Sequence, residues 1–318
     1  MVKYMKILGI GESVIDKIHI VPGCNENLEL FGASKTTQTD IGGPVLSALI
    51  LLSRLDLDCT LLTSIGVDLE GQIIRQKLRQ ENVRIVSNIE EKTKVNTILV
   101  NRRNGQREKL RGKIKHSPIK NIPTEFIQQF DLIILDRHEK DAFYEVINKK
   151  NPIAKIIIDP STEVSDYTKD MMRRSDYPII SIESLLQIGG HKGLTECLRD
   201  LYMVCNKPVI ITAGEIGSIV FNGKESKLIP ALKIKAIDTT GAGDIYRGAF
   251  AYGVVHGMNL EESAGFANSV AALQCTKLGN VSAIPSKEEV IPFAESFDKN
   301  QVSVSADINR FLLLDQSL

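Results

Sequence analysis

The sequence predicts a doubly wound α/β fold: a mostly parallel central sheet with helices on both faces, and a small β-sheet that forms a lid. Short, continuous apolar runs alternate with longer helical patterns, which is typical of parallel strands covered on both faces. Two turn-rich stretches with alternating residues interrupt this rhythm and indicate the second sheet. We treat residues 1–318 as one domain, with a lid formed by about 12–40 and 94–113 and a C-terminal tail over 300–318.

Composition narrows the classes of function. Lys+Arg and Asp+Glu both number 39, so the formal net charge is zero and gives no sign of a basic surface for nucleic acid or membrane. The five cysteines are scattered and form no CxxC pair, which favours reduced thiols over a disulfide framework or a metal site. The chain opens without a signal-peptide layout, and no apolar run reaches the roughly 18 residues of a membrane span. We therefore expect a soluble, cytoplasmic protein.

The elements of the main domain are expected to follow one another with short connections. A buried first strand covers 4–10, and a helix over 45–55 begins behind Pro44, because proline is tolerated in the first turn of a helix. The other expected strands are 58–65, 131–136, 154–159, 177–182, 207–213, 217–222 and 233–237. The other expected helices are 69–81, 139–150, a helix–loop–helix region that ends near 203, 244–256, 260–278 and 286–298.

The lid is expected to contain short strands. Residues 17–40 are polar and turn-rich with brief apolar alternations, and residues 94–112 alternate around the turn Arg103-Asn104-Gly105, which indicates a hairpin. Arg107 follows on the return strand. We consider it either an exposed charge at the rim or a contact of the lid with a substrate.

The strongest motif is Asp-Thr-Thr-Gly-Ala-Gly-Asp over residues 238–244, between an apolar, strand-like segment and a helical pattern. Such a junction leaves backbone N–H groups unpaired at the helix N-terminus, and these donors together with the helix dipole attract anions, above all phosphate. The small residues Gly241, Ala242 and Gly243 let the backbone approach an oxyanion closely. Asp244 would be repelled by that anion, so we assign it a role in proton transfer beside the phosphate.

Two further features lie where a ligand is expected. Asp16 follows the first strand, and open α/β sheets bind ligands at the carboxyl ends of their strands. Its carboxylate suits the hydroxyls of a polyol, although a solvated residue on an edge strand is an equal alternative. Gly42-Gly43 precedes a helix and permits close approach of a ligand, with a plain tight turn as the alternative.

A partial dinucleotide fingerprint needs separate treatment. Gly9-Ile-Gly11 follows the first strand, but Val14 occupies the position of the third glycine. A GxG pair without its third glycine is a weak signal. It argues against a nicotinamide-dependent dehydrogenase.

The stretch Asp238–Phe250 resembles the C-terminal signature of the ribokinase-like (PfkB) carbohydrate kinases, which include ribokinase, fructokinase, ketohexokinase and adenosine kinase. The resemblance covers residues from about 6 to 298. Asp16 and Gly42-Gly43 fall where the family places its substrate site. Two more stretches match family motifs, namely Gly66-Val-Asp68-Leu-Glu-Gly71 for GxDxxG and Thr212-Ala-Gly214-Glu-Ile-Gly217 for the nucleotide-site turn.

The resemblance implies transfer of the γ-phosphate of ATP to a hydroxyl, a primary alcohol, of a sugar or related small molecule. Asp244 would be the general base, and the turn Gly241–Gly243 would form the anion hole. Mg²⁺ would arrive with the nucleotide, held largely by phosphates and waters. The alternatives are a nucleoside kinase of the same family and a non-catalytic regulator that binds a sugar or nucleoside.

The resemblance also assigns secondary roles. Thr212, Gly214, Gly217 and Asn268 would contact the nucleotide, although Asn268 could also be a surface residue of its helix. Asp238 and Thr240 are candidate ligands of a monovalent cation, K⁺, with capping of the turn as the alternative role of Asp238. Members of the family often form homodimers through the lid, which we consider here as well.

Two positions depart from the family pattern. Ser47 stands where the family has a substrate-pocket asparagine, so contacts to the acceptor are expected to differ. The NxxE motif of the Mg²⁺–phosphate network would fall at Ser181 to Ser184, where both ends are serine and Glu183 lies one position away. Either water rebuilds this network or activity is weak.

Overall fold

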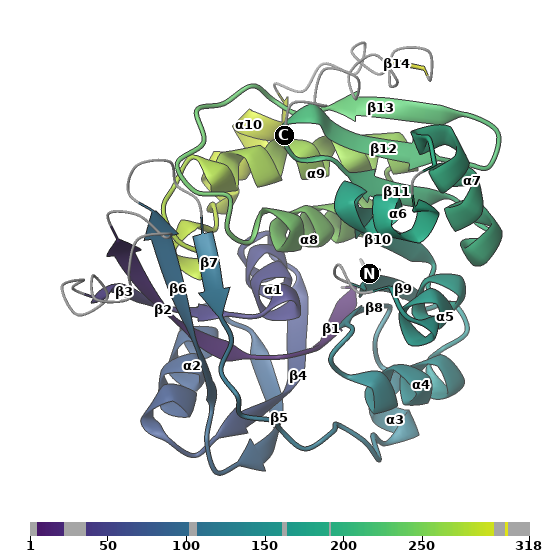
Figure 1. Ribbon diagram of the computed structural model, residues 1–318. Coiled ribbons are helices and arrows are strands. Elements are labelled where there is room, and N and C mark those ends of the chain that lie inside the picture. Colours follow the sequence, from purple (N-terminus) through teal and green to yellow (C-terminus); the bar gives the residue numbers. More distant parts are fainter. Residues whose placement is uncertain are drawn as a thin grey trace.

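The computed structural model describes residues 5–21, 36–101, 107–160, 164–190, 192–295 and 303–304. They form a ten-stranded sheet with the order β14-β13-β12-β11-β10-β9-β8-β1-β4-β5 and a separate four-stranded sheet with the order β3-β2-β6-β7 (Figure 1). The predicted doubly wound fold with an additional small sheet is confirmed.

The large sheet is parallel from β5 to β11 and antiparallel from β12 to β14. Its parallel strands are β1 (Lys6–Ile10), β4 (Asp58–Gly66), β5 (Arg84–Glu90), β8 (Leu132–Asp136), β9 (Lys155–Asp159), β10 (Tyr177–Ser181) and β11 (Val209–Thr212). The antiparallel strands are β12 (Gly217–Phe221), β13 (Ser226–Pro230) and β14 (Ser303–Val304). Of the predicted tail, only β14 lies within the described residues.

Helices cover both faces of this sheet (Figure 1). The apolar side chains of β8 alternate: Leu132 and Ile134 pack into the core beneath α1, α8 and α9, and Ile133 and Leu135 pack against α4, α5 and α7. This alternation is the period-2 geometry of a strand buried on both faces. The helices are α1 (Pro44–Arg54), α2 (Leu69–Gln80), α3 (Thr124–Ile127), α4 (Lys140–Lys149), α5 (Asp166–Arg174), α6 (Ile182–Gly189), α7 (Leu194–Cys205), α8 (Ala242–Val255), α9 (Leu260–Cys275) and α10 (Lys287–Glu295).

The small sheet lies beside α1 and α2, at one side of the large sheet (Figure 1). It contains β2 (Val14–Val21), β3 (Thr36–Gly42), β6 (Lys94–Asn101) and β7 (Arg107–Leu110). β6 and β7 pair antiparallel, which confirms the predicted hairpin, although its turn residues 103–105 lie outside the described part of the chain.

The expected strand over residues 233–237 is wrong. This segment is irregular, and the N–H groups of Ile237 and Asp238 donate to the carbonyl of Cys275 at the end of α9 instead of to a neighbouring strand. The side chain of Ile237 is 61% exposed, so the apolar pattern does not mark a buried strand here. Among the strands and α-helices of the described residues, those not predicted from the sequence are β5, β13, β14, α3 and α5.

The Gly9-Ile-Gly11 pair serves packing within the fold. A Cβ at Gly9 would overlap Val45 on α1, and a Cβ at Gly11 would overlap the carboxylate of Asp136 at the end of β8. Asp136 instead accepts hydrogen bonds from the N–H groups of Glu12 and His138, both at 2.9 Å. Close approach of these neighbours therefore explains the two glycines without a dinucleotide.

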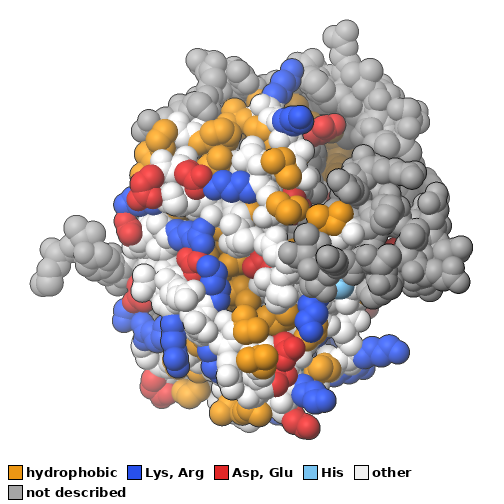
Figure 2. All heavy atoms as spheres, turned by 90° about the vertical axis from the view of Figure 1, so that its left-hand side faces the viewer, with side chains coloured by type: hydrophobic (Ala, Val, Ile, Leu, Met, Phe, Trp, Pro, Cys, Tyr) orange, Lys and Arg blue, Asp and Glu red, His pale blue; other side chains and the backbone are white. Residues whose placement is uncertain are grey.

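Surface properties agree with the balanced composition. On the face shown in Figure 2, Lys and Arg side chains are interspersed with Asp and Glu and with hydrophobic residues. Within the described part of the chain, no helix has the length and apolar character that crossing a bilayer requires. Cys59, Cys197, Cys205 and Cys275 are buried free thiols, as predicted for this part of the sequence.

Candidate active site

The carboxyl ends of the parallel strands bring several polar residues to one edge of the large sheet. Asp136 ends β8, Asp159 ends β9, Ser181 ends β10 and Thr212 ends β11. Because neighbouring parallel strands end at the same edge, the loops that follow them share one cleft. The small sheet continues directly from β1 at this edge, since β2 begins at Val14.

A cavity of about 210 Å³ lies where the two sheets meet. It contains five residues that the sequence analysis selected: Asp16, Gly43, Thr240, Gly241 and Asp244. Its other lining residues are Glu12, Val14, Pro44, Ile98, Lys109 and Asn280. Two separate sequence motifs, around Asp16 and around Asp244, therefore face the same space.

The turn before α8 is fixed by hydrogen bonds. Asp238 accepts from the N–H of Thr240 at 2.8 Å and from the N–H of Gly279 at 2.7 Å, so its carboxylate caps the turn. Gly241 has φ 74°, and a Cβ there would overlap Asn280 Oδ1, so only glycine suits this position. The N–H of Ala242 donates to Thr239 O at 3.3 Å, which commits one of the three proposed oxyanion donors to the turn.

Asp244 lies in the first turn of α8 and is about one-fifth exposed. Burial raises its pKa to about 7, with Arg247 and Lys109 opposing this rise and the carboxylates of Asp159 and Asp16 adding to it. A carboxyl group with this pKa can accept a proton near neutral pH.

Asp16 is buried at the bottom of the cavity. Its Oδ1 accepts a hydrogen bond from Asn96 Nδ2 at 2.9 Å, and Lys109 Nζ lies 3.9 Å away. Burial raises the pKa of Asp16, and the charge of Lys109 and the hydrogen bond from Asn96 oppose the rise. The alternative of a solvated edge residue is wrong.

The diglycine is required by its surroundings. A Cβ at Gly42 would overlap the carboxylate of Asp16, and a Cβ at Gly43, which has φ 139°, would overlap the backbone oxygen of Glu12. Gly43 also forms the N-terminal end of α1 and lines the cavity. The diglycine thus makes a tight turn and at the same time brings the backbone of α1 close to the ligand space.

Asn280 connects the walls of the cavity. Its Oδ1 accepts from Ser47 Oγ at 3.2 Å, its N–H donates to Asp40 Oδ2 at 3.1 Å, and its carbonyl accepts from Gln274 Nε2 at 2.8 Å. Ser47 is fully buried in this network and does not itself line the cavity. A single loop residue therefore joins β3, α1 and α9 beside Gly241.

The expected nucleotide residues lie further along the same edge. Gly214 has φ 54° and Gly217 has φ 116° in the turn between β11 and β12, after Thr212. Asn268 is buried, and its Nδ2 donates to Ile229 O at 2.8 Å and to Pro230 O at 3.4 Å. The alternative of a surface position for Asn268 is therefore wrong, because its side chain fastens α9 to β13.

The positions expected for NxxE form the beginning of α6. Ser181 Oγ accepts from the N–H of Ser184 at 3.3 Å, and the two hydroxyls lie 3.1 Å apart. Glu183 is exposed in the first turn of this helix. Ser181 is thus the N-cap of α6, and Glu183 is the carboxylate in the first turn of this helix that remains accessible to solvent.

The GxDxxG stretch has a structural role. Asp68 caps α2 by accepting from the N–H of Gly71 at 2.9 Å, and it also accepts from the N–H of Thr93 at 2.7 Å. This carboxylate joins the end of β4 to the segment that begins β6. It holds the small sheet in place without lining the cavity.

The structure also adds residues that the sequence analysis did not select. Lys109, on the return strand of the hairpin, reaches the cavity, whereas the side chain of Arg107 lies outside the described part of the structure. Glu12 lines the cavity and pairs with Lys94. Arg247 pairs with Asp159 at 2.7 Å. Glu12 follows the end of β1, whereas Lys109 lies within β7 and Arg247 within α8, and no residue pattern marked any of the three.

The comparisons with known proteins give one decisive match. The family model for pfkB family carbohydrate kinases matches residues 5–287. The chain belongs to this family.

A nucleoside kinase from Methanocaldococcus jannaschii is 24% identical to this chain, and the match covers 94% of this chain and 99% of that protein. A ribokinase from Lactococcus lactis is 28% identical, but the match covers only 52% of the chain and 54% of the ribokinase. The chain thus spans about half the length of that relative.

Solved structures of the pfkB family show the same fold. The ribokinase from Thermotoga maritima has a TM-score of 0.80 at 23% identity, covering 92% of this chain and 100% of that one. Ribokinase from Arabidopsis thaliana, complexed with ribose and ATP, has a TM-score of 0.74 at 19% identity over 93% and 99% of the chains. A putative ribokinase II from E. coli, in complex with ATP and Mg²⁺, has a TM-score of 0.74 at 16% identity over 92% and 99%.

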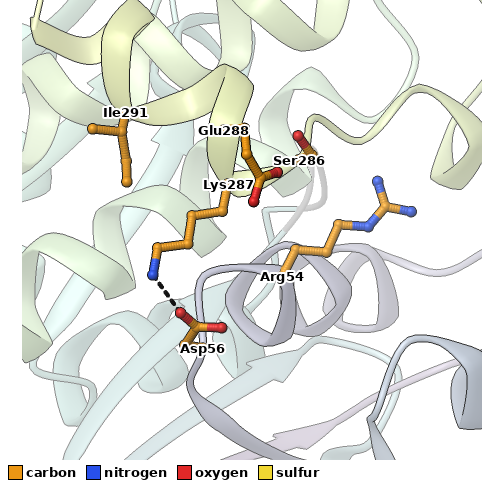
Figure 3. Close-up of a pocket in the computed structure, with 6 residues that line it drawn as sticks. All are labelled: Arg54, Asp56, Ser286, Lys287, Glu288 and Ile291. Carbon is orange, nitrogen blue, oxygen red and sulfur yellow. Dashed lines mark hydrogen bonds and ion pairs between the residues drawn. The ribbon is translucent and has the colours of Figure 1, made fainter.

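A second, larger hollow of about 610 Å³ lies between the end of α1 and the beginning of α10 (Figure 3). Lys287 crosses it and pairs with Asp56, while Arg54 points away from this pair. Because α1 begins at the cavity and ends just before β4 starts, this hollow lies at the opposite edge of the sheet. Lys287 pairs with Asp56 inside this hollow, and Arg54 pairs with Glu81 outside it, so of these two cavities we take the smaller one as the candidate active site.

Proposed function

We propose that the protein transfers the γ-phosphate of ATP to an alcohol hydroxyl of a sugar or related small molecule. The observation that carries this proposal is the shared cavity of Asp16, a buried acceptor of hydrogen bonds, and Asp244, a carboxyl group with a pKa of about 7 at the N-terminus of α8. Membership of the pfkB family and the ribose, ATP and Mg²⁺ present in structures of the same fold support it.

In this mechanism Asp16 holds hydroxyl groups of the acceptor, and Asp244 accepts the proton of the attacking hydroxyl. The new bond forms between that oxygen and the γ-phosphorus, and the bond between the γ-phosphorus and the bridging oxygen breaks to release ADP. The N–H groups of Gly241 and Gly243 and the dipole of α8 stabilise the charge on the transferred group. Thr212, Gly214, Gly217 and the helix carrying Asn268 form the nucleotide side of the site.

Metal ions are assigned supporting roles. The described residues contain no group of three or more metal-ligating side chains. We assign Mg²⁺ to the phosphates and to waters, where it would neutralise the charge of the phosphates. Glu183 is the exposed carboxylate that we assign to contact it through water. We assign K⁺ to Asp238 and Thr240, which are joined by a hydrogen bond in the turn before α8.

A nucleoside acceptor is the second candidate. The nucleoside kinase from Methanocaldococcus jannaschii aligns over nearly the full length of both chains, in contrast to the ribokinase from Lactococcus lactis. A non-catalytic regulator is disfavoured because a binding protein has no need for a buried base beside an anion site.

Turnover with a panel of sugars and nucleosides tests the proposal. The full chain is incubated with ATP and Mg²⁺, and ADP release is measured for each acceptor. We expect one acceptor class to support turnover and Asp244→Asn to reduce kcat by about 10²–10⁴-fold with little change in ATP affinity, because the general base is lost. Saturable binding of an acceptor without turnover would favour the regulator, and near-normal kcat in Asp244→Asn would contradict the assigned base.

We also propose that the small sheet acts as a lid. Ile98 and Lys109 line the cavity from β6 and β7, so this sheet supplies part of the wall that keeps water from the phosphoryl group. A homodimer through this sheet is the associated proposal. Sedimentation equilibrium of the full chain tests it, and a monomer at micromolar concentration would contradict it.

A further inference from the structure

Arg247 lies beside Asp244, the assigned base, and contacts two carboxylates. It follows Asp244 by three positions on α8, a spacing that places both side chains on one face of the helix. Its Nη2 is 2.7 Å from Asp159 Oδ1, and its Nη1 is 3.4 Å from Asp244 Oδ1. The side chains of Arg247 and Asp159 are 11% and 6% exposed, so water screens this cluster little.

The two contacts are unequal. The contact with Asp159 has the short distance of a charge-assisted hydrogen bond, whereas the contact with Asp244 is at the limit of hydrogen bonding. The Nε of Arg247 is buried without an acceptor among the described residues. The guanidinium is therefore shared between two carboxylates and held more firmly by the one at the end of β9.

We propose that Arg247 is a positioning residue that orients Asp244 and keeps it ionised, and that Asp159 draws the guanidinium away so that Asp244 remains a base. A full pair between Arg247 and Asp244 would weaken the base by satisfying its charge, and the absence of Arg247 would leave Asp244 beside another carboxylate. The pair between Arg247 and Asp159 holds the guanidinium in an arrangement between these two cases. This inference rests on the proposed role of Asp244 as general base.

Other charged groups also face Asp244. Lys109 approaches from β7, and Asp16 approaches from β2. Burial raises the pKa of Asp244, Arg247 opposes this most strongly, and Asp159 adds to it. Because Arg247 lowers the pKa of Asp244 and Asp159 raises it, substitutions of the two residues are expected to move the titration of Asp244 in opposite directions.

The dependence of kcat on pH, at saturating ATP and acceptor, tests this inference. Arg247→Met removes the cation, so we expect the acidic limb to move up by about one pH unit or more. Asp159→Asn releases the guanidinium to Asp244, so we expect the limb to move down. Arg174→Met is the control: it removes an Arg–Asp pair with Asp170 that is exposed on α5, and its profile should match that of the unaltered chain.

If Arg247 had a purely structural role, the two substitutions would lower activity without shifting the acidic limb of the pH profile in opposite directions. Limbs that stay in place, or that move in the same direction in both variants, would overturn the inference. If circular dichroism shows that Arg247→Met does not fold, Asp159→Asn alone tests the inference. A downward shift of its acidic limb supports the inference, and no shift or an upward shift overturns it.

A readout without turnover separates this inference from the proposed function. Carbon NMR of aspartate-labelled protein follows the titration of the Asp244 carboxyl group directly, with Asp244→Asn assigning the signal. Opposite shifts of this titration in Arg247→Met and Asp159→Asn support the inference even if no acceptor is found. Unchanged titration in both overturns it even if the chain is an active kinase.

Discussion

The carboxyl group of Asp244, the proposed general base, would link catalysis to stability. Its pKa of about 7, compared with an ordinary 3.8, means that the folded chain binds this proton more tightly than the unfolded chain. The associated stability is fully present below pH 3.8 and is lost as the pH rises through about 7. The same titration supplies the ionised base, so kcat is expected to rise over the range in which stability falls.

The stability of Asp244→Asn tests this relation. Asparagine stays neutral, so we expect the variant to be more stable than the unaltered chain at about pH 8, by on the order of 1–4 kcal/mol. The difference should shrink as the pH is lowered to about 5. Urea unfolding at both pH values measures it, with Asp58→Asn, an exposed carboxylate, as a control that should change little. A difference that is the same at both pH values would contradict the raised pKa.

Gly42 provides a second test at the level of single residues. A Cβ at this position would overlap the carboxylate of Asp16, so Gly42→Ala is expected to displace the group that we propose holds the acceptor. We expect the KM of the acceptor to rise about tenfold or more, corresponding to loss of about one hydrogen bond to a charged group, with the KM of ATP nearly unchanged. Gly193→Ala is the matched control, because a Cβ there meets no atom within 4 Å. An equal rise in both KM values would argue against a local displacement of Asp16.

Among the elements, η3 (Val281–Ala283) and the residue before it are held to the small sheet by the carboxylate of Asp40 and by a hydrogen bond from Gln38 Nε2 to Ser282 Oγ at 2.7 Å. Asp40 Oδ2 accepts from the N–H of Asn280 at 3.1 Å, the N–H of Ser282 at 3.0 Å and the hydroxyl of Ser282 at 2.9 Å. Asp40→Ala leaves the buried N–H of Asn280 and the part-buried donors of Ser282 without this acceptor and should destabilise the chain by about 1–3 kcal/mol. Amide exchange should rise at residues 280–283, and Ser282→Ala, which removes one of the three bonds, should have a smaller effect. Unchanged exchange there would show that the loop is held by other contacts.

The elements also show how far the sequence determined the fold and the site. The central strands were predictable because a run such as Leu132–Leu135 is apolar at every position and buries both faces. The segment 233–237 alternates apolar residues with two lysines, as a strand would, but no described strand pairs with it, and a single sequence does not report such a neighbour. Asp16 and Asp244 were recognisable from their motifs. Asn280 and Arg247 were not, because their roles depend on contacts with residues distant in the chain, such as Asp40 and Asp159.

In the whole molecule, the cavity takes its walls from the small sheet and from the segments that begin α1 and α8. Ile98 and Lys109 belong to the small sheet, whereas Thr240 and Asp244 belong to the segment that begins α8. In the proposed mechanism the acceptor contacts Asp16 and Asp244 together, so it would bridge the two parts, whereas ATP would lie on the side of the large sheet. Binding of the acceptor should therefore restrict the small sheet more than binding of ATP does.

Hydrogen exchange with mass spectrometry checks this expectation. With the acceptor bound, we expect slower exchange in β6 and β7, because a ligand that bridges both sheets stabilises the closed arrangement. With ATP alone, the slowing should centre on the turn after β11 and the beginning of α8. Ile98→Ala, which shortens a cavity wall of the small sheet, should reduce the protection by the acceptor but not that by ATP. Protection by the acceptor that stays within the large sheet would show that the small sheet is a fixed wall and not a lid.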